Sequence, residues 1–161
     1  MMTQNEPMQR LAELLKDASI AMLTTVSPED KLISRPMAIQ ETEFDGDLWF
    51  IFSEDSPKAQ QIKDEAEVNV SFESKHTWVS LSGRGRIVHD RAKLEENWST
   101  GVDAWFPDGI DTPGVALLKV EAESAQYWEA KGGPVKMATE LLKARGSDHQ
   151  PDIGQSKKVE L

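Results

Sequence analysis

Cysteine is absent from this chain of 161 residues. The absence excludes disulfide bonds, thiolate metal sites and cysteine nucleophiles. It is consistent with a reducing compartment, and we expect a cytoplasmic protein. The length is sufficient for one domain with its own hydrophobic core, and no repeat or linker divides the chain. We place this domain over residues 1–146 and a polar, mobile tail over residues 147–161.

Long apolar runs and an excess of basic charge are absent as well. No run approaches the roughly 20 residues that a membrane-spanning helix needs. The first ten residues, MMTQNEPMQR, lack the basic and then apolar order of a secretion signal. The net charge of −10 argues against nucleic acid and anionic membranes as partners, because phosphate groups are bound by basic surfaces.

The sequence also lacks a recognisable acid–base constellation. Its three histidines, His76, His89 and His149, are far apart, and none has a partner at metal-ligand spacing. No serine lies in a nucleophile elbow, and the acidic residues are scattered. We therefore assign no catalytic residue and no metal site.

Alternating and β-branched segments predict six strands. They cover residues 20–26, 33–43, 48–53, 68–72, 77–89 and 115–128. Helical spacing predicts helices over residues 6–17 and 57–66, a third helix capped by Asp90, and a fourth from Gly133 to near Gly146. Because the strands do not alternate regularly with helices, we predict a mainly β (α+β) fold, a six-stranded antiparallel barrel with flanking helices.

Proline and glycine mark irregular places in this pattern. Pro36 cannot donate to a strand ladder, so the second strand should be interrupted, bulged or at an edge there. Gly83 and Gly85 predict a sharp bend or a close backbone contact in the fifth strand. The Asp-Gly centre of residues 44–47 predicts a hairpin between the second and third strands. Residues 101–114 should form a loop whose large aromatic side chains need a covering surface.

The segment over residues 48–66 is predicted to be a strand, a tight loop and a helix. Ser56 stands at the N-cap position of this helix, and Lys58 lies in its first turn. A cation there opposes the helix dipole unless an anion is bound, so the segment is a candidate phosphate site. The alternative is an exposed lysine without a ligand, which the negative charge of Glu54 and Asp55 favours.

Arg35 and an excess of tryptophan are further candidates. Arg35 lies on the strand before this segment, where its charge needs either an acceptor on a ligand or a surface ion pair with a carboxylate. The five tryptophans are Trp49, Trp78, Trp98, Trp105 and Trp128. Each is more often a core or interface residue than a ligand contact. An aromatic cofactor with a phosphate tail would use the tryptophans and the phosphate site together.

Several segments occur in an order that is typical of a known protein family. They are ISRPM, LWFIFSEDSPK, WVSLSGRGRIVHD, AWFPDGIDTPG and AQYW, and they span about residues 8–143. Their order resembles the FMN-binding split barrel of the pyridoxamine 5′-phosphate oxidase-like family, and more closely its general stress protein 26 branch. The resemblance implies a split β-barrel and a homodimer that binds FMN in clefts between its subunits.

The resemblance also implies which residues bind FMN. Residues 35–37 would run along the flavin ring and ribityl chain, the end of the next strand would contact the cofactor, and the turn after it would bind the phosphate. Two tryptophans would reach the cofactor across the subunit interface. The implied contacts are Arg35, Pro36, Met37, Phe52, Ser53, Ser56, Lys58, Trp78 and Trp105.

Two departures from the oxidases limit the expected activity. Pro57 stands where they usually carry an arginine, and the segment after Trp128 lacks their Arg-Leu-His-Asp-Arg motif for the vitamin B6 substrate. We therefore expect an FMN-dependent oxidoreductase of unknown substrate, with a nicotinamide or another small molecule as electron donor, rather than a pyridoxamine phosphate oxidase. The alternatives are a non-catalytic flavin carrier or sensor, and haem binding on the same fold through His76 or His89.

Overall fold

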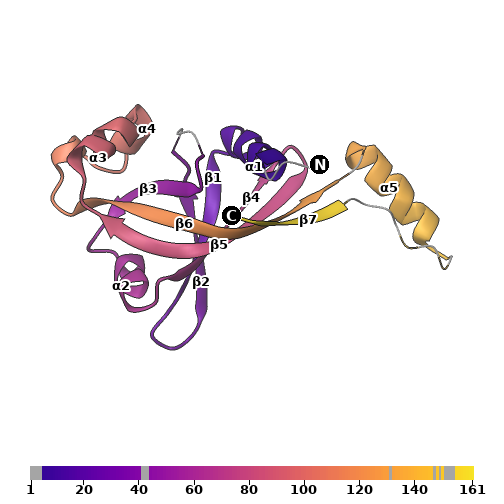
Figure 1. The fold of residues 1–161 in the computed structure, drawn as a ribbon, viewed down its shortest axis with the longest axis horizontal. Helices are drawn as coiled ribbons and strands as arrows, with labels where there is room; N and C mark the ends of the chain where they lie inside the picture. Colours follow the sequence, from indigo (N-terminus) through magenta and orange to yellow (C-terminus); the bar gives the residue numbers. More distant parts are fainter. Residues whose placement is uncertain (1–4, 41–43, 131, 147, 149, 151–154) are drawn as a thin grey trace.

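The computed structural model describes residues 5–40, 44–130, 132–146, 148, 150 and 155–161. Its centre is a seven-stranded antiparallel sheet that curls into a half-barrel (Figure 1). The strands are β1 (Ile20–Val26), β2 (Leu32–Ala38), β3 (Asp47–Ser53), β4 (Glu67–Ser74), β5 (Thr77–Val88), β6 (Val115–Glu129) and β7 (Gln155–Glu160). The helices are α1 (Asn5–Lys16), α2 (Pro57–Asp64), α3 (Arg91–Asn97), α4 (Thr100–Asp103), the 3-10 helix η1 (Gly109–Asp111) and α5 (Gly133–Ala144). The predicted fold class is confirmed, with a seventh strand added.

The sheet is open between its two edge strands, β2 and β3. The strand order is β2-β1-β4-β5-β6-β3, and β7 pairs with the far part of β6. The predicted hairpin between β2 and β3 is therefore wrong, because the described part of β2 pairs with β1 and β3 pairs with β6. The turn at Asp45 and Gly46 is present, but it directs β3 toward β6: the amide of Ala122 donates to the carbonyl oxygen of Gly46 at 3.0 Å.

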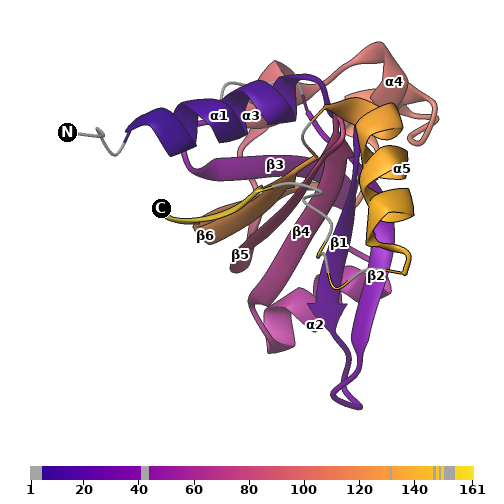
Figure 2. The same cartoon turned by 90° about the vertical axis from the view of Figure 1, so that its right-hand side faces the viewer.

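The inner face of the curled sheet holds the hydrophobic core. Leu23 of β1 and Phe50 of β3 are completely buried, and the side chains of both strands alternate in burial. Helix α1 lies across one end of the half-barrel (Figure 2), and its Leu11 and Leu14 complete the core there. Burying such side chains stabilises the fold by about 1.5–3 kcal/mol each.

Proline and glycine have the predicted roles in two strands. Pro36 lies on the edge strand β2 opposite Met22, in a register that runs without a bulge. Of the three predicted alternatives, the edge position is therefore the correct one. The register of β5 against β6 shifts between Ser82 and Gly83. A Cβ atom on Gly83 would overlap the carbonyl oxygen of Glu121, so the predicted close backbone contact is confirmed.

Strand β2 is shorter than predicted, and the chain after it rejoins the sheet later. The prediction extended this strand to residue 43, whereas it ends at Ala38. Residues 41–43 lie outside the described residues. The end of β2 and the end of β3 lie at the opening of the sheet, and a ligand-sized cavity forms between them.

Part of the predicted mobile tail is a strand. β7 pairs with β6 from Gln155 opposite Glu129 to Glu160 opposite Ser124. β3 covers only the first part of β6, so the remaining edge is free to accept β7. Val159 is buried, which adds an apolar contact. The tail prediction is therefore wrong for these residues, while residues 147, 149 and 151–154 lie outside the described part, and the domain boundary stays a prediction.

The predicted loop over residues 101–114 contains short helical turns, α4 and η1. Before it, the carboxylate of Asp90 accepts a hydrogen bond from the amide of Lys93 at 3.1 Å, which confirms the predicted cap of α3. None of the described helices is both long enough and apolar enough to cross a membrane.

Candidate functional site

A cavity of about 570 Å³ lies where β2 and β3 separate. One wall is the end of β2 and the residues after it, from Pro36 to Gln40, and another is the end of β3, from Ile51 to Ser53. Lys58 of α2 and the segment around α4 complete it. The volume is in the range of about 300–1,000 Å³ that small-molecule sites occupy. The open edge of the sheet therefore provides a ligand-sized space.

The cavity gathers residues that are distant in sequence. Six of the nine residues implied as FMN contacts line it: Pro36, Met37, Phe52, Ser53, Lys58 and Trp105. Arg35, Ser56 and Trp78 do not line it within the one chain. Sequence reasoning missed Ile39, Gln40 and Val102. The last of these belongs to α4, where the sequence predicts only a loop, so no helical pattern pointed to it.

Lys58 is the only charged side chain that lines the cavity among the described residues. It is partly buried, and its ammonium lies 5.9 Å from the centre of the Phe52 ring. It forms no ion pair with a described residue. Burial lowers the pKa of Lys58, and repulsion from Arg35 lowers it further. A cation in this state is stabilised by a bound anion, and no described residue supplies one.

Arg35 is held by neutral acceptors. Its guanidinium donates to the hydroxyl of Thr25 at 2.7 Å, to the side-chain carbonyl of Gln61 at 3.1 Å and to the carbonyl oxygen of Leu23 at 3.3 Å. No ion pair joins it to a described carboxylate, so the surface ion pair that we considered is not found among the described residues. Burial lowers the pKa of Arg35. The residue fastens β2 to β1 and α2 beside the cavity.

Ser56 occupies the predicted N-cap position, but its side chain does not cap α2. Its hydroxyl donates instead to the carbonyl oxygen of Ser53 at 2.6 Å. This bond fixes the tight turn between β3 and α2. The side chain of Ser56 therefore caps no amide of α2, although its backbone carbonyl oxygen accepts from the amide of Ala59 at 3.0 Å. Pro57 has no N–H to donate, so the amide of Lys58 is the first of the helix that can bind another oxygen.

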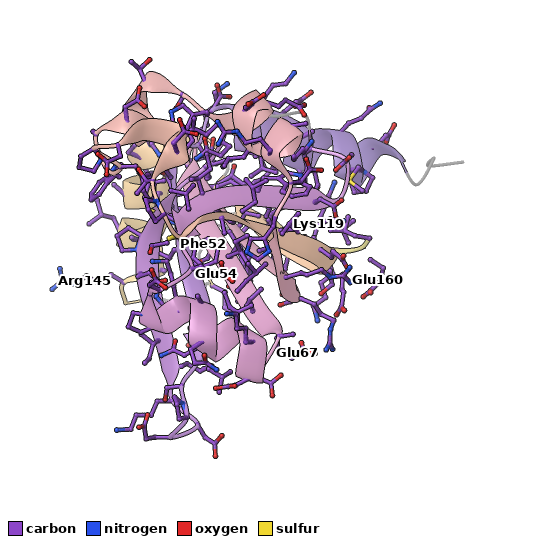
Figure 3. The ribbon with its side chains drawn as sticks, turned by 90° about the vertical axis from the view of Figure 1, so that its left-hand side faces the viewer. Phe52, Glu54, Glu67, Lys119, Arg145 and Glu160 are labelled. Carbon is purple, nitrogen blue, oxygen red and sulfur yellow. The ribbon has the colours of Figure 1, made fainter. Side chains whose placement is uncertain are left out.

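The carboxylate of Glu54, beside this turn, interacts with side chains outside the cavity. Glu54 follows β3 next to Phe52 (Figure 3), and its carboxylate lies 2.7 Å from His89 and 3.5 Å from Lys63. The hydrogen bond with His89 is the main reason why the pKa of Glu54 is lowered. Glu54 thus opposes an anion at Lys58 less than its position in the sequence suggests.

Trp105 lines the cavity of its own chain, with 80% of its surface exposed. The neighbouring Phe106 ring contacts Trp98, with 5.8 Å between the ring centres. The indole of Trp98 also donates to Asp103 at 2.8 Å. These contacts hold the α4 segment over the cavity and leave Trp105 as a large aromatic surface at its mouth.

Trp78 lies elsewhere in the chain. It is on the outer face of β5, directly opposite Trp128 of β6, and both are exposed, at 45% and 41%. The two histidines considered as haem ligands, His76 and His89, do not line the cavity either. Nowhere in the described part of the chain do three metal-ligating side chains gather as a metal site requires.

A larger cavity of about 730 Å³ lies beside the first one, near the end of α1. Ile39 and Gln40 line both, so the two spaces adjoin at the end of β2. Lys58 and Phe52 do not reach the larger cavity. The larger cavity is lined by Lys16 together with the carboxylates of Asp17 and Asp47, whereas Lys58 is the one charged side chain described along the smaller cavity. The smaller cavity is therefore the candidate anion-binding site.

The family described as "Pyridoxamine 5′-phosphate oxidase like" matches residues 6–152. The chain belongs to this family. The predicted resemblance is thereby confirmed, and its general stress protein 26 branch is supported by the relatives below.

Two curated relatives are similar in sequence. Protein bli-3 of Neurospora crassa is 32% identical over 129 residues, which cover 73% of this chain and 62% of that protein. General stress protein 26 of Bacillus subtilis is 24% identical over 135 residues, which cover 80% of this chain and 93% of that protein. The chain thus spans less than two thirds of bli-3 and nearly all of the Bacillus protein.

Two solved structures are similar in fold and sequence. A general stress protein 26 from Jannaschia sp. CCS1 has a TM-score of 0.74 and 28% identity, covering 97% of this chain and 99% of that one. The general stress FMN/FAD binding protein of Xanthomonas citri has a TM-score of 0.67 and 29% identity, covering 75% of this chain and 87% of that one. The predicted split-barrel fold is confirmed by these neighbours.

Proposed function

We propose that this family member binds FMN in the cavity between β2 and β3 and acts as a flavin-dependent oxidoreductase of the general stress type. One observation carries the proposal: Lys58 is a partly buried cation at the start of a helix, it lines the cavity, and it has no ion pair among the described residues. A phosphate group there would relieve the unfavourable burial of the charge.

The described residues fit the parts of FMN. Lys58 would bind the phosphate, with the hydroxyl of Ser53 and the turn fixed by Ser56 beside it. The apolar side chains of Met37 and Phe52 would contact the rest of the cofactor, and Trp105 would shield it from water at the mouth of the cavity. Bound FMN would supply electron and hydride transfer, which amino-acid side chains do not provide.

The proposal includes a homodimer with FMN at the subunit interface. Trp78 does not line the cavity of its own chain, so its contact with FMN would come from a second copy. Ile20, Met22, Trp78 and Trp128 are exposed apolar side chains on strands of one sheet. An exposed apolar surface of this kind is uncommon on a monomer, and an interface between two copies would cover it.

A second candidate is a flavin carrier or sensor without turnover. Its support is the absence of Asp, Glu and His among the described residues that line the cavity. The described chain therefore offers no general acid or base there other than Lys58, whose role is to bind phosphate. Any turnover would rest on the flavin and on a substrate that brings its own reactive hydrogen.

The absorption spectrum of the purified protein tests the cofactor directly. We expect the bands of bound flavin, and heat release should give FMN. A spectrum of haem, or a protein that neither contains nor takes up flavin, would contradict the proposal. Steady-state oxidation of NADH or NADPH with candidate acceptors then separates the two candidates, because a carrier would bind FMN without sustained turnover.

A further inference from the structure

Helix α5 presents its apolar side chains to solvent. Val135, Ala138 and Leu142 follow one another at spacings of three and four residues, so they share one side of the helix. All three are exposed, Val135 at 80% and Leu142 at 70%. The less exposed residues lie on the opposite side: Met137, Glu140 and Ala144. The outward side of α5 is therefore apolar, the reverse of an ordinary surface helix.

The position of α5 explains why its own chain does not cover this side. β6 continues past the barrel with β7 beside it, and α5 lies beyond their end, away from the curled sheet (Figure 1). Arg145, directly after the helix, stands outside the outline of the barrel (Figure 3). A helix of 12 residues is marginal alone in water, so α5 needs a surface to pack on.

Part of the outer face of the sheet carries no charge, and its borders are charged: Glu73 of β4 pairs with Trp78, and Glu160 and Lys158 of β7 pair with Ser124 and Gln126. Two adjacent rows of directly paired residues cross five strands with no ionisable side chain: Ser34, Thr24, Asn69, Ser82 and Ser124, then Pro36, Met22, Ser71, Ser80 and Gln126. Charged residues make up 29% of the chain, so this gap is unusual. The exposed Trp78 and Trp128 lie on the same face, one position further along.

The charges of the chain also favour contact between copies. Residues 130–161 hold six basic and four acidic residues, whereas the remainder of the sequence has a net charge of −12. The arm that carries α5 is thus weakly basic and the body is strongly acidic. This difference in charge would favour contact between the arm of one molecule and the body of another.

From these observations we infer that α5 of one copy packs on the outer sheet face of a second copy, with Val135, Ala138 and Leu142 in the contact. The contact is reciprocal, as in a two-fold symmetric dimer. Each arm then extends across its partner and buries the uncharged rows. The inference rests on the homodimer of the proposed function, and it assigns the parts of the chain that hold that dimer together.

Paired substitutions on the two sides of α5 test the contact in the full-length protein. Val135→Gln/Leu142→Gln removes the apolar side and keeps the charge unchanged. We expect it to raise the dissociation constant of the dimer about a hundredfold or more in sedimentation velocity, since each dimer loses four buried apolar side chains. Lys136→Gln, away from the apolar side, is the control and should change the constant less than about threefold.

Because the chain has no cysteine, single introduced cysteines locate the contact. Mixing Leu142→Cys with Met22→Cys and adding a short thiol cross-linker should join the two variants, and flavin absorbance is recorded on the same samples. A dimer that the glutamine variant leaves intact would overturn the inference while the flavin proposal stands. Cross-linking of Leu142→Cys only to itself would also overturn it. A monomeric wild type that still binds flavin would refute the dimer and this contact together.

Discussion

Lys58 and Arg35 show at the residue scale how the fold supports the proposed anion site. Arg35 is fastened by Thr25, Gln61 and the backbone, so its charge stays near the cavity without occupying it. Its repulsion adds to the burial that lowers the pKa of Lys58. The place of Lys58 in the first turn of a predicted helix suggested that it binds a phosphate. Only the structure shows that Lys58 has no counterion among the described residues.

The lowered pKa of Lys58 predicts a pH dependence. A phosphate binds the ammonium form, and in the free protein this form is lost below the ordinary lysine pKa of 10.5. We therefore expect the ratio of FMN to riboflavin affinity to fall as pH rises through this lowered pKa. Fluorescence titrations at a series of pH values from neutral upward measure the ratio. A ratio that stays constant up to the ordinary pKa would place the phosphate away from Lys58.

Arg35→Met should destabilise the flavin-free protein. Three acceptors lose a charged donor, and a hydrogen bond of this kind is worth about 1.5–3 kcal/mol. The free energy of unfolding in urea measures the loss. Arg84→Met is the control, because Arg84 makes only an exposed ion pair with Glu67, which is worth about 0–1 kcal/mol. Similar small losses for both would show that the buried bonds of Arg35 contribute little.

At the scale of elements, Gly83 of β5 lies against the backbone of β6 at a bulge, where Glu123 of β6 is the extra residue. Gly83→Ala should lower stability by about 1–3 kcal/mol, because the added methyl meets backbone atoms of β6 that cannot move aside. Gly101→Ala is the matched control: its nearest neighbour would be the Ser99 hydroxyl at 3.8 Å, and it lies in α4, where alanine is favoured. Thermal unfolding compares them, and equal stability would contradict the account of the bulge.

Local signals in the sequence predicted most of the elements. β1 has the predicted bounds because its β-branched run is bordered by turn residues, and α2 begins at Pro57 as its cap sequence indicates. An edge position for Pro36 was one of three predicted alternatives, and the structure confirms it. Each of these predictions depended on chemistry within a few residues.

Pairing between distant segments was less predictable. The Asp-Gly turn at Gly46 is real, but a turn does not determine which strand the chain joins next, and β3 pairs with β6. β7 was missed because QSKKVE has only Val159 as an apolar signal, and its place is set by the free edge of β6. The family resemblance predicted several of the residues that line the cavity. Ile39, Gln40 and Val102 could be identified as lining residues only from the fold.

At the scale of the whole molecule, membership of the family does not imply the activity of a pyridoxamine phosphate oxidase. The chain shares the fold and the family of pyridoxamine 5′-phosphate oxidase-like proteins. After Trp128, however, it continues into the arm and α5 instead of an arginine- and histidine-containing segment. We expect FMN-loaded protein to form negligible pyridoxal phosphate from pyridoxamine phosphate. Turnover comparable to that of a true oxidase would show that another part of the chain binds this substrate.

The central claim is that FMN binds between β2 and β3 with its phosphate at Lys58. A paired titration of Lys58→Ala with FMN and riboflavin, followed by flavin fluorescence, tests it most directly. Lys63→Ala on the same helix is the control, because Lys63 pairs with Glu54 and does not line the cavity. We expect Lys58→Ala to weaken FMN about ten- to a hundredfold, with less effect at high salt, and to leave riboflavin nearly unchanged. Equal losses for both ligands, or no loss for either, would contradict the account.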